Sequence, residues 1–215
     1  MKTLKIDFVS DVACPWCAVG LNALEHALER VRPELDAELH FQPFELNPTM
    51  PPEGADMKEY LQSKYGMSNE QLAEGQVRIA ERGAAEGFSF GKRTFIWNTF
   101  DAHRMLRWAG TEGAPGTQRA LKHALLRAYH GEGRNPGAHD VLLELAAEVG
   151  LPGDRAREVL ESGAFADEVR AAERFWQELG IHSVPAVVID RKHLISGGQP
   201  SAVFEQALRQ IAAQG

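Results

Sequence analysis

Strand-like sequence lies near both ends of this chain, and a long helical stretch separates the two parts. Residues 4–9 alternate apolar and polar side chains, and residues 39–46 predict a second strand in which Pro43 favours an edge position or a bulge. Residues 184–189 and 194–196 flank a polar turn and predict a β-hairpin. The strand-forming segments are therefore discontinuous in sequence, and the residues between them must form an insertion.

Helical periodicity fills most of the remaining chain. Residues 15–33 carry apolar side chains at spacings of three and four, and Pro15 suits the first helical position, where its missing N–H has no partner. Further helices are predicted at 68–85, where Ser68 opens a capping box, and at 99–109, 117–129, 138–149, 165–179 and 201–211. In the helix at 165–179 we expect Val169, Ala172, Phe175 and Leu179 to face inward.

The two cysteines of the chain, Cys14 and Cys17, lie three positions apart in the sequence SDVACPWC. This spacing is compatible with a redox centre, with half of a metal site or with two inert, packed thiols. A structural zinc site normally needs four ligands, and the sequence holds no second CxxC and no HxxxH, so we expect no metal. The proline between the thiols and the start of a helix there favour redox chemistry over inert packing.

Charge and hydropathy narrow the classes of partner. The chain has 30 acidic and 23 basic side chains, a formal net charge of −7, and so offers no basic surface to nucleic acid or to an anionic membrane. No segment approaches about 18 uninterrupted apolar residues, and no apolar run precedes a small-residue cleavage site near the N-terminus, so we expect a cytoplasmic protein. Disulfides in that compartment are usually transient and catalytic, which favours chemistry at the CxxC.

The chain resembles the DsbA-like branch of the thioredoxin superfamily, and most closely its FrnE-like proteins. The resemblance spans nearly the whole chain and rests on SDVACPWC at 10–17, PFELNP at 43–48, NTFDAHR at 98–104, HSVPAVVID at 182–190 and ISGGQP at 195–200. It implies an α/β fold in which an inserted α-helical domain, residues 51–164, interrupts a discontinuous thioredoxin-like domain, residues 1–50 and 165–215. Some FrnE-like proteins carry a further cysteine pair, which this chain lacks.

The same resemblance implies a disulfide oxidoreductase in which Cys14 is the nucleophile, Cys17 is the resolving thiol and Pro185 is a cis-proline facing them. The residues agree with these roles, because Cys14 falls at a helix N-terminus, which favours a thiolate, and Cys17 falls on the apolar stripe of that helix. The backbone at Val184 is then placed to pair with an extended substrate strand.

The two residues between the cysteines, Pro15 and Trp16, are expected to border the substrate and to tune the redox potential. A strongly oxidising relative has the active-site sequence CPHC. In this chain Trp16 replaces the histidine and removes a hydrogen-bond donor and a potential positive charge, so we expect less stabilisation of the thiolate and a weaker oxidant.

Other polar residues are candidates for the surroundings of the thiols. His182 is a candidate for stabilising the attacking thiolate, with a surface position as the alternative. Asn98 and His103 fall in a region that helps to shape the ligand cleft in kappa-class glutathione transferases and chromene-carboxylate isomerases, with an exposed helix face as the alternative. Asp7 and Glu45 are candidate proton acceptors beneath the thiols, but we expect both carboxylates to be solvated or capped.

The sequence therefore predicts a thiol–disulfide oxidoreductase that acts on protein or small-molecule disulfides and thiols through a mixed disulfide. We expect no bound cofactor, with glutathione or the thioredoxin system as redox partner. The alternative is a glutathione-dependent transferase or isomerase of the kappa-class or chromene-carboxylate isomerase type, which shares the split fold but usually has serine at the first active-site position.

Overall fold

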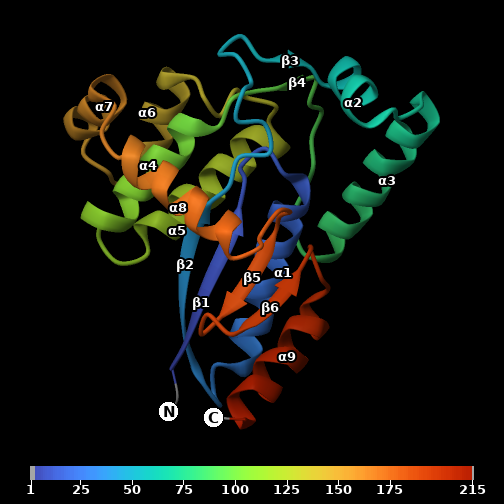
Figure 1. Cartoon of the computed structure of the whole chain (residues 1–215), viewed down its shortest axis with the longest axis vertical. Coiled ribbons are helices and arrows are strands. Elements are labelled where there is room, and N and C mark those ends of the chain that lie inside the picture. The colour runs from blue at the N-terminus through green and yellow to red at the C-terminus, as the bar shows by residue number, and fades with distance from the viewer. Residues whose placement is uncertain (1–2, 215) are drawn as a thin grey trace.

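The two ends of the chain share one sheet in the computed structural model, which describes residues 3–214 (Figure 1). Strand β1 (Thr3–Ser10) lies parallel to β2 (Asp36–Pro43) and antiparallel to β5 (Ala186–Ile189). Strand β6 (His193–Ser196) pairs antiparallel with β5, which gives the order β2-β1-β5-β6. The predicted hairpin and the sharing of a sheet between distant segments are confirmed.

Strand β2 lies at the edge of the sheet, as the proline within it predicts. Its predicted bounds, 39–46, are wrong, because the strand begins at Asp36, opposite Thr3, and ends at Pro43, opposite Ser10. Proline has no N–H with which to extend the hydrogen-bonded ladder, so the chain leaves the sheet there.

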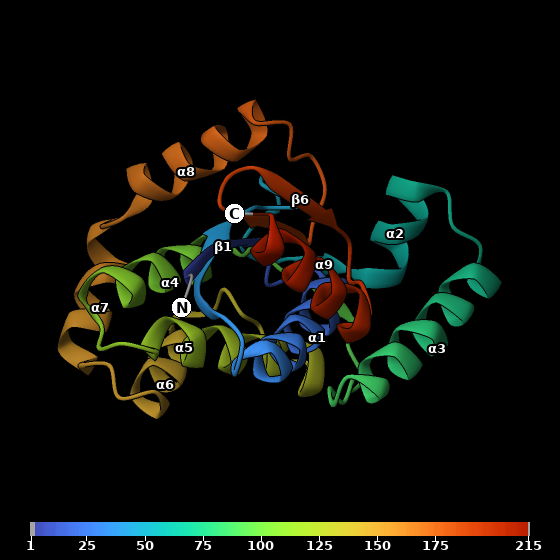
Figure 2. The same ribbon diagram turned by 90° about the horizontal axis from the view of Figure 1, so that it is seen from below.

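Helices cover both faces of this sheet (Figure 2). On one face, α1 (Pro15–Val31) packs beside α9 (Ser201–Ala213), and on the other lies α8 (Ala166–Glu178). Successive side chains of β1 point to opposite faces of the sheet. Leu4, Ile6 and Phe8 pack with α1 and α9, whereas Val9 packs against Trp176 of α8. Each such buried side chain stabilises the fold by about 1.5–3 kcal/mol.

The inward face predicted for α8 is largely wrong. Val169 is buried, but Phe175 and Leu179 are 36% and 57% exposed, and the other buried residues of the helix are Glu173 and Trp176. Glu173 can turn inward because Arg170 pairs with it at 2.9 Å. The buried face is therefore rotated relative to the apolar stripe.

The helices of the intervening chain form two groups on opposite sides of the sheet end (Figures 1 and 2). One group is a bundle with its own apolar core: α4 (Phe100–Glu112), α5 (Thr117–Leu126), α6 (His139–Glu148) and α7 (Gly153–Ser162). The other, which we call the arm, consists of α2 (Met57–Tyr65) and α3 (Asn69–Ala85). A short ribbon of β3 (Ala55–Asp56) and β4 (Phe95–Ile96) joins the two, and the domain boundaries at 50–51 and 164–165 stay a prediction.

Two local features refine the predicted helices. The capping box at Ser68 is present, with the side chains and backbone of Ser68 and Gln71 bonded in both directions. The helix predicted at 117–129 instead ends at Leu126 and continues as a π-helix, η1 (Arg127–Gly131). Helix α2 and the β3–β4 ribbon were not predicted. Within residues 3–214, every helix is too short or too polar to cross a membrane.

Candidate active site

Cys14 and Cys17 occupy the first turn of α1, and both thiols are free. Cys14 is the N-cap residue, with Pro15 at the first helical position, and the Cys14 Sγ donates a hydrogen bond to the carbonyl oxygen of Val184 at 3.6 Å. Cys14 is 4% exposed and lines a cleft, whereas Cys17 is fully buried. A substrate can therefore reach Cys14 but not Cys17.

Two loops approach the cysteine helix closely, and glycines make this possible. The Val184–Pro185 peptide bond is cis, and a Cβ at Gly20 of α1 would lie 3.1 Å from the Pro185 ring. A Cβ at Gly198, in the loop after β6, would lie 2.9 Å from the backbone oxygen of Trp16. The segments HSVPAVVID and ISGGQP thus meet SDVACPWC in space.

Asp11 is a buried carboxylate that ties two distant parts of the chain to the loop before Cys14, and it was not predicted. Its Oδ1 accepts hydrogen bonds from the Ala13 N–H at 3.1 Å and the Thr99 hydroxyl at 2.8 Å, and lies 3.3 Å from the Nε2 of His103. Its Oδ2 accepts from the Leu46 N–H at 2.7 Å. Burial alone would raise the pKa of Asp11, but His103 and the backbone N–H groups hold it below its ordinary value.

Lys122 of α5 is a buried cation near the thiols, and it was also not predicted. Its side chain is 1% exposed, and burial lowers its pKa while the nearby charges of Cys17 and Asp11 oppose that shift. Burial raises the pKa of the Cys17 thiol well above its ordinary value, and the hydrogen bond with Cys14 raises it further. The ammonium of Lys122 acts in the opposite direction and favours the Cys17 thiolate.

His130, in the π-helix, fixes the loop before the cysteines. Its Nε2 lies 2.8 Å from the carbonyl oxygen of Val12, whose side chain packs into the core of the helical bundle. Burial lowers the pKa of His130 well below its ordinary value, and the charge of Arg93 acts in the same direction. The ring is therefore neutral and donates its Nε2 hydrogen to Val12. π-Helical turns often occur at functional sites, and this one supports the loop that carries Cys14.

The remaining predicted polar residues do not line the cleft at Cys14. His182 is exposed, in agreement with its surface alternative, and Asn98 bonds to the backbone of Met50 and Phe100. An exposed helix face for His103 is wrong, because this side chain is 2% exposed and lies against Asp11.

A solvated position for Asp7 and Glu45 is also wrong. Asp7 is 1% exposed and accepts a hydrogen bond from Gln42 at 2.7 Å, and Glu45 is buried in an ion pair with Arg170. Both carboxylates are buried because each has a polar partner on a neighbouring element, which the apolar periodicity of the sequence does not reveal.

A cleft of about 400 Å³ opens in front of Cys14. One wall consists of Cys14, Pro15, Trp16 and Val184, so three of the predicted substrate-binding residues line it. The opposite wall is the arm, whose apolar side chains Met57, Leu61, Leu72 and Ile79 face the cysteine loop across the cleft.

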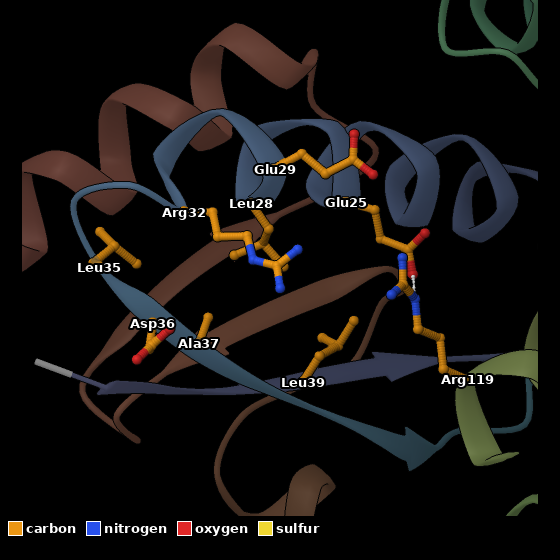
Figure 3. Close-up of a pocket in the computed structure, with 9 residues that line it drawn as sticks. All are labelled: Glu25, Leu28, Glu29, Arg32, Leu35, Asp36, Ala37, Leu39 and Arg119. Carbon is orange, nitrogen blue, oxygen red and sulfur yellow. Dashed lines mark hydrogen bonds and ion pairs between the residues drawn. The ribbon is translucent and has the colours of Figure 1, made fainter. Parts of the chain in front are cut away.

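A second cavity, of about 350 Å³, lies between α1 and β2 (Figure 3). Leucines such as Leu28 and Leu39 line it together with charged side chains, of which Glu25 is paired with Arg119 at 2.6 Å. It contains no thiol, and the carboxylate of Glu25 is already paired with Arg119. We therefore assign the candidate active site to the cleft at Cys14. Among residues 3–214, no three His, Cys, Asp or Glu side chains are grouped so as to hold a metal.

Comparison with known proteins agrees with this fold. Residues 5–209 match the family described as DSBA-like thioredoxin domain. A probable DsbA oxidoreductase from Streptomyces coelicolor is 36% identical, with 99% of this chain and 91% of that chain covered and a TM-score of 0.90. The uncharacterised protein YwbO of Bacillus subtilis is 27% identical over 96% of each chain. The cytosolic disulfide reductase DsbM of Pseudomonas aeruginosa, solved with glutathione, has a TM-score of 0.64 at 24% identity, covering 95% of this chain and 99% of its own.

Proposed function

The chain belongs to the DSBA-like thioredoxin domain family, and we propose that it is a thiol–disulfide oxidoreductase whose redox centre is the pair Cys14 and Cys17. One observation carries the proposal: a reachable thiol at a helix N-terminus stands in front of a second thiol that is fully buried one turn later. This arrangement suits an attacking and a resolving cysteine. The FrnE-like subgroup and the cytoplasmic location stay predictions.

In the proposed reaction, the Cys14 thiolate attacks one sulfur of a substrate disulfide. A bond forms between Cys14 and that sulfur, and the other half of the substrate leaves as a thiolate. The positive end of the α1 dipole stabilises the Cys14 thiolate before attack. Loss of the thiol hydrogen also frees the carbonyl of Val184, which can then accept a hydrogen bond from a substrate.

In the second step, the Cys17 thiolate attacks the sulfur of Cys14, the mixed disulfide breaks, and the second half of the substrate leaves. Two electrons pass from the dithiol to the substrate, and the two thiol protons pass to the leaving thiolates or to water. Because burial disfavours the Cys17 thiolate, the nearby Lys122 ammonium assists this step. The reverse sequence reduces the protein disulfide at the expense of a substrate dithiol.

Trapping of the mixed disulfide tests this assignment. The Cys17→Ser variant, treated with the small neutral compound hydroxyethyl disulfide, should gain the mass of one half of the reagent on Cys14. The wild-type protein should instead form the internal disulfide, and Cys14→Ser should react far more slowly because its remaining thiol is buried. Equal rates for wild type and Cys14→Ser would refute Cys14 as the nucleophile.

The direction of exchange depends on the reduction potential of the pair, which equilibration with glutathione measures. About 30 mV corresponds to roughly 1.4 kcal/mol for a two-electron couple, so a modest difference decides between reductase and oxidase. We propose glutathione or a thioredoxin-type protein as the redox partner. Glutathione-dependent activity that survives Cys17→Ser would favour the transferase or isomerase alternative instead.

A further inference from the structure

The cleft in front of Cys14 is mainly apolar, and the charge among its described lining residues is positive. Methionine, leucine, isoleucine and tyrosine side chains from the arm form much of its apolar lining, including Met57, Tyr60, Leu61 and Leu72. Among the described residues that line it, Arg93 is the only charged side chain, and Asn47 and Gln76 add two neutral amides. A ligand that fills this space must therefore be mainly apolar.

Arg93 is held in the cleft wall without a counter-ion. Its guanidinium lies 5.2 Å from the ring centre of Tyr129, and within residues 3–214 no carboxylate lies within 4.0 Å of it. Several other arginines at the surface are instead paired, as Arg127 is with Glu148 and Arg134 with Glu144. A half-buried guanidinium beside apolar surface is well suited to bind a carboxylate, because charge-assisted hydrogen bonds to arginine are strong and can be bidentate.

The same features make other disulfides slower to react than a small apolar one, so glutathione and thioredoxin-type proteins serve as redox partners rather than as the preferred substrate. Glutathione carries two carboxylates and an ammonium in each half, whereas the residues that line the cleft include one cation, Arg93, and no carboxylate. The ammonium of Lys64 lies beside the cleft but is already bound to the Leu46 carbonyl and the Asn47 side chain. A disulfide in a folded protein must reach a thiol that is 4% exposed and faces the arm across the cleft. A small molecule can enter a space of about 400 Å³ directly.

We propose that the cleft takes a small disulfide, or the thiol derived from it, with an aromatic or aliphatic body and one carboxylate per half. Arg93 binds the carboxylate, the arm covers the apolar body, and the sulfur meets Cys14. This inference rests on the proposed thiol–disulfide exchange and names the substrate class of the same site. The chemistry is that of the two steps above: each half of the substrate leaves as a thiolate, and the protein dithiol becomes a disulfide.

Two aromatic disulfides of similar size, one charged and one neutral, separate the contribution of the carboxylate from that of the apolar body. Reduced protein is mixed with dithiobis(nitrobenzoate), which has one carboxylate per half, or with neutral dipyridyl disulfide, and the coloured thiol is followed by stopped flow at about 0.15 M salt. Arg93→Gln should slow the reaction with the carboxylate compound about 10- to 100-fold and leave the neutral one within about twofold. Arg78→Gln is the matched control, because Arg78 is exposed on α3 and does not line the cleft, and it should slow neither.

A second variant tests the space itself. Gly75 of α3 lines the cleft, and a Cβ there would meet no atom within 4 Å, so Gly75→Phe can be accommodated without a backbone clash and should fill part of the cleft. It should slow both aromatic disulfides at least tenfold while leaving the stability of the protein unchanged or higher, since glycine is a poor helix former.

The outcomes separate the two proposals. Oxidised glutathione should react with the wild-type protein more slowly than dithiobis(nitrobenzoate) does. The ratio of these two rates should be larger for the protein than for a free model thiol, which has no cleft. An equal effect of Arg93→Gln on both aromatic compounds, or no effect of Gly75→Phe, would overturn the substrate class while leaving the redox function intact. If the wild-type protein reacts with every one of these disulfides no faster than Cys14→Ser does, the proposed function itself is refuted.

Discussion

Replacement of Asp11 by asparagine is the most direct test of how the site is held together. The carboxylate of Asp11 is fully buried and joins the cysteine loop to the segment after β2, through Leu46, and to the start of α4, through Thr99. In Asp11→Asn the amide oxygen can replace Oδ1, but the amide nitrogen then faces the N–H of Leu46, which donated at 2.7 Å. Two donors then face each other in a buried position.

The expected loss of stability follows from these contacts. A hydrogen bond to a charged group contributes about 1.5–3 kcal/mol, and a buried donor left unsatisfied costs about 1–3 kcal/mol. Loss of the negative charge beside His103 adds to this, so the free energy of unfolding at pH 7 should fall by about 3–5 kcal/mol. Urea unfolding followed by tryptophan fluorescence measures it. Asp140→Asn, an exposed position in α6, is the matched control and should change stability by less than about 0.5 kcal/mol.

The pH dependence gives a second, independent check. The pKa of Asp11 is lowered in the folded protein below its ordinary value of 3.8, so its contribution to stability is fully present above that value and is lost as the pH falls through the folded pKa. The difference between wild type and Asp11→Asn should therefore narrow in acid. A loss under about 1 kcal/mol at pH 7, or a difference that widens as the pH falls, would refute the role of Asp11 as the central acceptor.

Three further changes probe neighbouring contacts. Lys122→Met removes the ammonium that opposes the rise in the pKa of Cys17, so the resolving step should slow at neutral pH. In rapid-mixing experiments the midpoint of the pH–rate profile of this step should move to higher pH, and an unchanged profile would contradict the role of Lys122. Gly198→Ala places a Cβ 2.9 Å from the backbone oxygen of Trp16 and should cost about 1–3 kcal/mol in urea unfolding, whereas Gly153→Ala, with open space around it, should cost nothing. Trp16→His should raise the reduction potential by about 30 mV or more in equilibration with glutathione, and a lower potential would count against the role assigned to Trp16.

The order of the elements could be predicted because apolar periodicity and helix signals report on it directly. The alternation in residues 4–9, the capping box at Ser68 and the polar turn between 189 and 194 each correspond to an observed element. The inward face of α8 could not be obtained in this way. A carboxylate such as Glu173 counts as a surface residue in any apolar pattern, and only the contact with Arg170 allows its burial.

The thiols of the candidate site could be predicted, but the charged groups behind them could not. Asp11 precedes the cysteines by three positions without any pattern that marks it as buried, since its partners come from α4 and from the segment after β2. Lys122 did leave a signal, because it shares a helix face with Leu125, Leu126 and Tyr129, all of which are buried. A cation within an apolar stripe indicates either an error in the assigned face or a buried partner for the charge.

The arm supplies one wall of the cleft, while Cys14 lies in the opposite wall and Cys17 is buried one turn further along the same helix. The tendency to give or accept electrons and the choice of molecule with which to exchange them are therefore encoded in separate stretches of the chain. Substitutions between residues 57 and 79 can reshape what the protein accepts without altering the cysteine helix, its dipole or the groups behind Cys17. Grafting the arm of one such protein, together with the segment that carries Arg93, onto the redox centre of another should accordingly transfer selectivity and leave the reduction potential nearly unchanged.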